Sequence, residues 1–392
     1  MQTKQRLTST QRMFSATAAA YFFLAASAAA FQSAAMAADE VTVTVGVAAP
    51  LSGNNAAYGK DLLNGVQLAV DSANGKKLTI GGKSAHFVVL AQDDQADPKT
   101  AVEVAQLLAD KKVAVVIGHE NSGTTLPASR IYANAGIPMI TPSATNPTIT
   151  SQGFSNVFST IATDAQNAGN AGKYAVEVTK AKRIAVLDDR TAFGQGEADE
   201  FVKAVKAANG NVVDREFTTD KAVEFSAQLT HIKSTNADLV FVATLNPQAA
   251  MIVKRMKQLG IAAQFVGGGG VMEPTFLSLA GGSAEGAMAW EYGEPIASLP
   301  GGAAFQSNYE KTFHTPMLTY APFAYDATWA AIHAMQAANS PDPTQYLAKL
   351  HSQAVDGITG PIAFSDTGAL KDPSSTLYEV KNGKWTPITT KH

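Results

Sequence analysis

Residues 113–125 read VAVVIGHENSGTT, and residues 138–147 read PMITPSATNP. Each stretch begins with a short apolar run, which is typical of a strand buried on both faces of a sheet. Each run then passes into a loop of small and hydroxyl-bearing residues. Two such strands, separated by a helical segment, predict a parallel sheet, and the loops that follow parallel strands share one edge of it.

The same alternation of strand and helix signals runs through the chain twice. Strands are expected at 41–48, 86–91, 113–117 and 138–141, with helices at 58–73, 98–110 and from 124. After about residue 162, strands are expected at 184–187, 212–217, 239–242 and 265–266, with helices at 166–178, 196–208, 225–234 and 248–259. We therefore predict the α/β class, with two doubly wound lobes whose sheets are largely parallel.

The C-terminal tail is less regular. Helices are expected at 303–313 and 325–338, and short strands at 361–364 and 377–380. Periodicity alone does not say which lobe these elements join.

The N-terminus has the pattern of an export signal. Three basic residues, Lys4, Arg6 and Arg12, precede an apolar, Ala-rich run at 13–31, and Ala-Met-Ala at 35–37 fits a cleavage site. We expect residues 1–37 to be removed, so that the mature chain begins at Ala38. The alternative is that the segment stays as an uncleaved membrane anchor.

Composition excludes several classes of protein. The chain has 392 residues, 46% of them hydrophobic, which is typical of a folded protein large enough for two domains. Its formal net charge is −3 and it lacks a Lys/Arg-rich run, so a nucleic-acid or anionic-membrane partner is not expected. The absence of cysteine excludes disulfides, thiolate metal sites and a lipobox anchor. These features fit a soluble periplasmic protein.

The two loops of the opening stretches are the candidate ligand site. Both combine small residues, hydroxyl groups and the start of a predicted helix, where free backbone N–H groups carry partial positive charge. Together they could clamp a carboxylate or phosphate without any Lys or Arg. Ordinary helix capping would explain either loop alone. Tyr58 either lines the same cleft or is an ordinary aromatic residue near a helix start.

Signals for an enzyme are weak. The seven histidines show no HExxH and no metal spacing, and Gly267–Gly270 fits neither a Walker nor a Rossmann glycine pattern. His119 could act in catalysis, but support of its loop is the simpler interpretation. The neighbouring acids Asp93-Asp94 and Asp188-Asp189 are expected to be solvated or capping residues. We therefore predict neither catalysis, nor a metal, nor a cofactor.

Several segments together resemble a known family. They are VGVAAPLSGNNAAYG (45–59), VIGHENSGTTLPAS (116–129), GIPMITPSATNP (136–147), DDRTAFGQG (188–196), SAEG (283–286) and YAPFAYDA (320–327). In this order and spacing they resemble the periplasmic branched-chain amino acid binding proteins of ABC importers, which have the type I periplasmic binding fold. The resemblance covers nearly the whole mature chain.

The resemblance implies two lobes joined by a three-segment hinge. Lobe 1 would comprise residues 38–162 and 293–364, and lobe 2 residues 163–292 and 365–392. The ligand would lie between them.

It also implies a set of ligand-binding residues. Ser122 and Thr145 would bind the ligand α-carboxylate, and the Ser143 carbonyl and Thr145 hydroxyl would face the α-amino group, with Ala144 in the same loop. The side-chain pocket would be walled by Tyr58, Phe193, Leu245 and Tyr320.

One departure from the family pattern concerns the amine. Relatives usually supply an acid from a lobe 2 loop, at the position that Gly269, or Gly268 one place earlier, occupies in this chain. A buried ammonium without its carboxylate costs roughly 3–5 kcal/mol. Either Glu120, Asp189 or Glu273 takes over this role, or the ligand is a carboxylate without an α-amine.

The function that the sequence predicts is solute binding in the periplasm. The protein would capture an amino acid or related small carboxylate and deliver it, as a monomer, to the permease subunits of an ABC importer. A ligand-binding sensor of the same fold is the alternative.

Overall fold

The computed structural model describes residues 40–392, and a six-stranded sheet forms its first half. The predicted export signal and its cleavage site lie outside the described residues. The strands are β1 (Glu40–Ala49), β2 (Thr79–Ile80), β3 (Lys83–Asp93), β4 (Val115–Gly118), β5 (Met139–Thr141) and β6 (Val157–Ser159). Their order is β2-β3-β1-β4-β5-β6, and all pairs except β2–β3 are parallel. Because β3 and β4 lie on opposite sides of β1, the strand order reverses there, which is where such sheets bind ligands.

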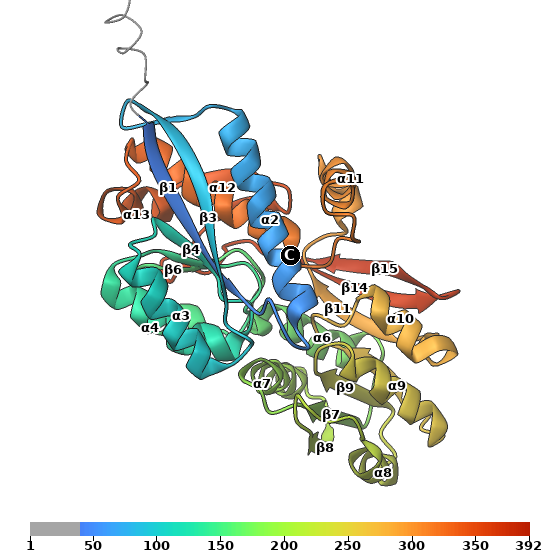
Figure 1. Ribbon diagram of the computed structural model, residues 1–392. Helices are drawn as coiled ribbons and strands as arrows, with labels where there is room; N and C mark the ends of the chain where they lie inside the picture. Colours follow the sequence, from blue (N-terminus) through green and yellow to red (C-terminus); the bar gives the residue numbers. More distant parts are fainter. Residues whose placement is uncertain (1–39) are drawn as a thin grey trace, which may run out of the picture.

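Helices cover both faces of this sheet (Figure 1). They are α2 (Ala56–Gly75), α3 (Pro98–Asp110), α4 (Ser122–Ala135), α12 (Ala321–Ala338) and α13 (Pro343–Ser352). Val43, Val45 and Val47 of β1 pack in one core with α2 and α12, whereas Ala48 packs in another with α3 and α4. The apolar character of both faces of β1 therefore follows from its central place between two helical layers.

A seven-stranded sheet forms the second half. Its strands are β7 (Ile184–Asp188), β8 (Val212–Phe217), β9 (Leu239–Ala243), β10 (Gln264–Gly267), β11 (Met288–Tyr292), β14 (Ser375–Lys381) and β15 (Lys384–Lys391). Their order is β15-β14-β11-β10-β9-β7-β8; β14 and β15 are antiparallel additions to a parallel sheet. The helices around it are α6 (Asp164–Glu177), α7 (Ala192–Ala207), α8 (Ser226–Ser234), α9 (Gln248–Gln258) and α10 (Pro274–Ala280). The predicted class, α/β with two doubly wound sheets, is confirmed.

The C-terminal tail divides between the two sheets. Helices α12 and α13 pack on the first sheet, whereas β14 and β15 extend the second. The remaining elements are α5 (Thr148–Ser151), α11 (Gly302–Phe313), β12 (Ala354–Gly357), β13 (Gly360–Ala363) and the short helices at Gly281–Ala284 and Ile296–Ser298. The chain thus passes between the sheets after β6, after β11 and before β14. The lobe boundaries given above stay a prediction.

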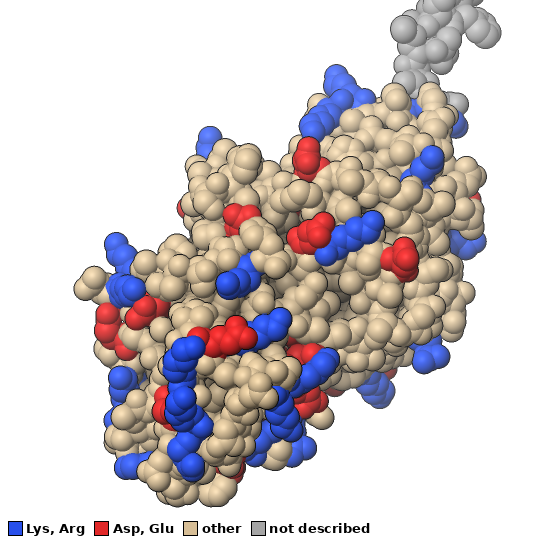
Figure 2. All heavy atoms as spheres, turned by 180° about the vertical axis from the view of Figure 1, so that it is seen from behind, with Lys and Arg blue, Asp and Glu red and all other residues tan. Residues whose placement is uncertain are grey.

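Two further features concern the charges on the surface and the apolar character of the helices. Acidic and basic side chains are interspersed over most of the face that Figure 2 shows. Within residues 40–392, no helix combines the length and the apolar character needed to cross a membrane.

Candidate functional site

The two loops that the sequence singled out meet at the edge of the first sheet. Ser122 is the first residue of α4, and its hydroxyl accepts hydrogen bonds from the backbone N–H groups of Thr145 and Asn146, both at 3.3 Å. Both Ser122 and Thr145 are about 1% exposed. The Thr145 hydroxyl has no hydrogen-bond partner among the described residues. The predicted clamp residues are therefore neighbours, and one of their hydroxyl groups is unpaired.

Ser143 and Ala144 hold the second loop in place. The Ser143 hydroxyl donates to the Glu120 carbonyl at 3.0 Å, and the Ala144 N–H donates to the Thr141 hydroxyl at 2.9 Å. That hydroxyl in turn donates to the His119 carbonyl at 3.0 Å. These bonds tie the loop after β5 to the loop after β4, so the two loops act as one unit.

His119 has a supporting role in this arrangement. Its Nδ1 lies 2.7 Å from Oδ2 of Asp94, and its Nε2 lies 3.0 Å from the Tyr132 hydroxyl. All three residues are fully buried. The imidazole therefore connects the loop after β4, to which His119 belongs, with the end of β3 and with α4. This agrees with the interpretation of His119 as a loop-supporting residue.

All four paired acids accept a hydrogen bond from the backbone N–H group two residues later, as expected of capping residues, but one member of each pair is fully buried rather than solvated. Asp94 is fully buried against His119, and Asp188 is fully buried beside Arg215, whose guanidinium lies 2.8 Å from its carboxylate. The neighbouring Asp93 and Asp189 do accept bonds from nearby backbone N–H groups, as capping residues would. In the second pair both acids are buried, since Asp189 is only 5% exposed.

The predicted wall residues come from both lobes. The rings of Tyr58 and Tyr320 lie 5.8 Å apart between centroids. The Tyr58 hydroxyl crosses to the second lobe and donates to the Gly270 carbonyl at 3.1 Å. Leu245 lies against the same glycine, since a Cβ added to Gly270 would be 2.6 Å from a Leu245 methyl group. These three wall residues therefore meet around Gly270.

Phe193 lies at the edge of this group. It is half-buried and is the second residue of α7. The side chain of Asn146 donates to the carbonyl of the adjacent Ala192 at 2.7 Å. This bond holds the start of α7, and Phe193 with it, next to the clamp loop.

The glycine run after β10 lacks an acid, but an acid from α7 fills the adjacent space. A Cβ added to Gly268 would lie 2.1 Å from both carboxylate oxygens of Glu197, and the Gly269 N–H donates to Oε1 of Glu197 at 2.8 Å. A Cβ added to Gly269 would lie 2.1 Å from the Tyr292 hydroxyl. Sequence reasoning missed Glu197; the available signal was its place one helical turn after Phe193, which puts both on one side of α7.

The three acids named as replacements for the missing one differ in their surroundings. Asp189 accepts from the Thr191 N–H at 2.9 Å and hydroxyl at 2.7 Å, so it holds Thr191, the N-cap residue of α7. Glu273 accepts from the Thr319 hydroxyl at 3.3 Å. Glu120 is 2% exposed, and its Oε2 has no partner among the described residues. Of the three, Glu120 has a free carboxylate oxygen.

Burial dominates the electrostatics of the site. Burial raises the pKa of Asp164 to about 7, although the Thr145 hydroxyl beside it opposes the shift. Burial likewise raises the pKa of Glu120 to about 8 and that of Glu291 to about 7, although the Glu291 carboxylate accepts three backbone N–H groups. The pKa of Glu197 is raised well above its usual value by burial and then by the nearby Asp164.

Two cavities border the contact between the lobes. One of about 790 Å³ lies outside the Tyr58 contact and is lined by Asn246, Pro247 and Glu273, among others. Another of about 420 Å³ is lined by Glu291, Tyr292 and residues of α12. Neither is lined by Ser122 or Thr145, which are both buried.

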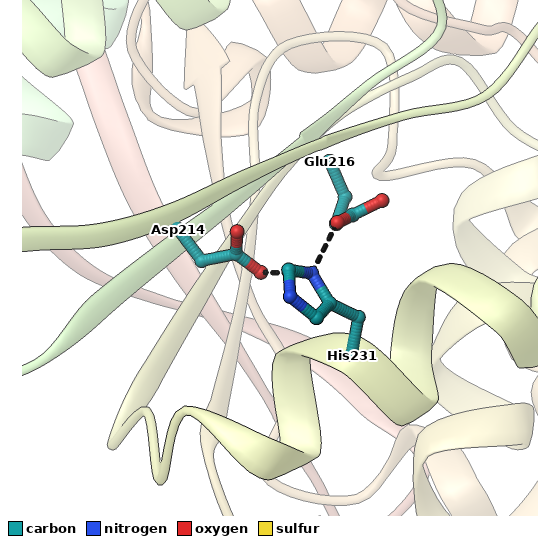
Figure 3. Close-up of side chains that lie close together, drawn as sticks. All are labelled: Asp214, Glu216 and His231. Carbon is teal, nitrogen blue, oxygen red and sulfur yellow. Dashed lines mark hydrogen bonds and ion pairs between the residues drawn. The ribbon is translucent and has the colours of Figure 1, made fainter.

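One surface cluster has side chains that could ligate a metal ion. His231 of α8 lies between Asp214 and Glu216 of β8 (Figure 3). Their potential ligand atoms lie within 4.8 Å of one another. The Glu216 carboxylate hydrogen-bonds the imidazole and raises the pKa of His231, with Asp214 adding to the shift. The cluster lies away from the clamp and behaves as an exposed ion pair.

Comparison with known proteins shows which family and which proteins this chain is similar to. Residues 42–384 match the family described as periplasmic binding protein. The chain is 32% identical over 375 residues to the leucine-, isoleucine-, valine-, threonine-, and alanine-binding protein of Pseudomonas aeruginosa, with 96% of each chain covered. The leucine binding protein LivK of Thermotoga maritima is 25% identical and has a TM-score of 0.81, with 89% of this chain and 98% of that chain covered.

A further neighbour shares the fold. It is a solute binding protein from Rhodopseudomonas palustris in complex with benzoate, 24% identical, with a TM-score of 0.79 over 89% of this chain and 96% of that chain.

Proposed function

The chain belongs to the periplasmic binding protein family, and on this basis we propose that it captures an amino acid or related small carboxylate between its lobes and delivers it to an ABC importer. The names of its amino acid-binding relatives support the ligand class. No reaction is catalysed in this proposal. The protein acts as a periplasmic monomer, and the permease subunits of the importer recognise its closed form.

The paired clamp loops carry this proposal. Ser122 and Thr145 present hydroxyl and backbone N–H groups within one buried unit at the ends of β4 and β5. A carboxylate prefers such donors, since N–H groups at a helix start favour negative charge. The Ser122 hydroxyl, which bonds the two N–H groups within the protein, can rotate to donate to an incoming carboxylate.

Replacing Thr145 with alanine tests the clamp. We expect the affinity for the preferred amino acid to fall about 10- to 100-fold, because a hydrogen bond to a charged group contributes about 1.5–3 kcal/mol. The melting temperature should change little, since among the described residues this hydroxyl makes no hydrogen bond of good geometry. Calorimetric titration of refolded protein measures the effect. The matched control is Thr148→Ala, an exposed threonine at the start of α5; equal affinities of the two variants would contradict the site.

Replacing Tyr58 with phenylalanine tests closure of the lobes. The change removes only the hydroxyl, which donates across the cleft to the Gly270 carbonyl at 3.1 Å and more weakly to the Asn246 carbonyl at 3.4 Å. Loss of one such bond should weaken ligand binding about 2- to 10-fold through a less stable closed form. Titration gives the affinity, and small-angle scattering gives the ligand-induced change in radius of gyration. Tyr325→Phe, in the contact of α12 with Phe305, is the control. An unchanged affinity and an unchanged radius would rule out this role.

A further inference from the structure

A group of buried polar side chains lies where the chain crosses between the lobes. Asp164 opens α6 just after the first crossing, and Tyr292 ends β11 just before the second. Glu197 reaches this point from α7, and Thr145 from the clamp loop. The Asp164 N–H donates to the Thr145 carbonyl at 2.9 Å. Asp164 and Glu197 are fully buried, and Thr145 and Tyr292 are 1% and 6% exposed.

The side chains of this group converge. A Cβ added to Gly196, the residue before Glu197, would lie 3.3 Å from Oδ2 of Asp164. The Tyr292 hydroxyl lies against Gly269, whose N–H donates to Glu197. The Thr145 hydroxyl lies close enough to Asp164 and Tyr292 to lower the pKa of each against the larger effect of burial.

Most of the polar atoms in the group have no partner. Within the described part of the chain, both carboxylate oxygens of Asp164, Oε2 of Glu197 and the hydroxyl groups of Thr145 and Tyr292 lack a hydrogen bond. A buried polar atom left unsatisfied costs about 1–3 kcal/mol, and more when it is charged. Native structures keep few such atoms, and a group of them at one point needs an explanation. The two hydroxyl groups supply at most two donors for two carboxylates with several acceptor sites each, so the group has room for a ligand that brings further N–H donors.

We propose that Glu197 and Asp164 bind the α-ammonium group of a zwitterionic amino acid whose carboxylate lies at Ser122 and Thr145. This inference rests on the proposed function and narrows its ligand class. An ammonium group has three N–H donors, which suit Oε2 of Glu197 and the two oxygens of Asp164. The Thr145 hydroxyl, next to Asp164, would then lie between the two ends of the ligand.

The charge of the group explains why an amine-free acid is a poor ligand. The main influences on the pKa of Glu197 are burial and the acids Asp164, Glu291 and Asp189, opposed by the Gly269 N–H. Without a ligand these buried acids hold their protons more tightly than usual, and an amine-free carboxylate would bring no positive charge to ionise them. An amino acid would instead bring the positive charge that ionised Glu197 and Asp164 require.

The test is calorimetric titration of refolded mature protein with leucine, phenylalanine and alanine and with their amine-free counterparts isocaproate, hydrocinnamate and propionate. For the parent protein we expect the amino acids to bind at least about 100-fold more tightly than the matching acids. Glu197→Gln keeps an acceptor for the Gly269 N–H and removes only the charge. It should weaken amino acid binding about 30-fold or more and leave the amine-free acids unchanged or tighter. Glu177→Gln, an exposed acid of α6, is the control.

A double variant separates the charge from the fold. In Glu197→Ala/Gly268→Glu the carboxylate moves to the glycine run, where the three atoms nearest to an added Cβ belong to the removed Glu197 side chain. It should restore most of the amino acid affinity that Glu197→Ala loses.

The outcomes are distinct. Equal amino acid affinities for Glu197→Gln and Glu177→Gln, or preference of the parent protein for the amine-free acids, would overturn this inference alone. If the parent protein bound no compound of the panel, the proposed function would be overturned as well.

Discussion

Replacing His119 with alanine is expected to lower the free energy of unfolding by roughly 3–5 kcal/mol, the typical loss when a buried carboxylate is left without its partner. The variant leaves the Asp94 carboxylate fully buried, with the Ala96 N–H as a remaining donor at 3.0 Å. It also leaves the Tyr132 hydroxyl without the imidazole and opens a cavity in a packed region. Each of these changes destabilises the folded state.

Chemical denaturation measures this loss, and the melting temperature should fall by about 4–7 °C. The matched control is His86→Ala, because His86 is exposed on β3. We also expect weaker ligand binding in His119→Ala, since the His119 carbonyl accepts from the Thr125 and Thr141 hydroxyls in the clamp loops. A loss of stability no larger than that of His86→Ala would show that the imidazole does not support the loops.

The fold was predictable because its central strands are buried on both faces. Val115–Gly118 and Leu239–Ala243 are fully buried, so they appear in the sequence as uninterrupted apolar runs. Strand β11 was missed because its sequence, MAWEY, contains Glu291. That carboxylate is buried, yet it is satisfied by three backbone N–H groups of the loop after β10. Periodicity cannot show such a long-range pairing.

The candidate site was predictable to a similar extent. Ser122 and Thr145 could be found because hydroxyl groups directly after two parallel strands must share an edge of the sheet. Glu197 could not, because a glutamate in a helix usually faces solvent. Its burial depends on Gly268, whose lack of a side chain leaves room for the carboxylate. The relation between these two residues exists only in the folded chain.

Acidification from pH 8 to pH 5 is expected to stabilise the protein in the absence of ligand. Among the described residues, eight buried acids have pKa values raised chiefly by burial. The pKa is about 6 for Asp61, Asp189 and Asp326, about 7 for Asp164 and Glu291, and about 8 for Glu120; it is well above its usual value for Glu197 and Glu273. In the unfolded chain such groups lose their protons near pH 4. Between these values the folded state holds more protons than the unfolded state. The stability that these groups contribute is therefore fully present below about pH 4 and is lost as the pH rises through 6 to 8.

Other groups set the limits of this profile. Hydrogen bonds lower the pKa of exposed carboxylates such as Asp97, Asp342 and Glu224, and their contribution is lost only as the pH falls below about 4. Burial lowers the pKa of His333, which opposes the trend for a single group. Maximum stability is therefore expected near pH 5.

The size of this change in stability follows from the number of extra protons that the folded state holds. Each extra proton held by the folded state costs about 1.4 kcal/mol of stability per unit rise in pH. One such proton over two units already lowers the melting temperature by roughly 4 °C. Thermal melts of refolded protein from pH 5 to pH 8 measure the slope, which Glu120→Gln should reduce and the surface control Glu177→Gln should not. A stability that stays constant or rises over this range would contradict the protonation of the buried acids.

A saturating concentration of the preferred amino acid should reduce the dependence of stability on pH. The ammonium group favours the ionised forms of Asp164 and Glu197 and so removes their excess protons.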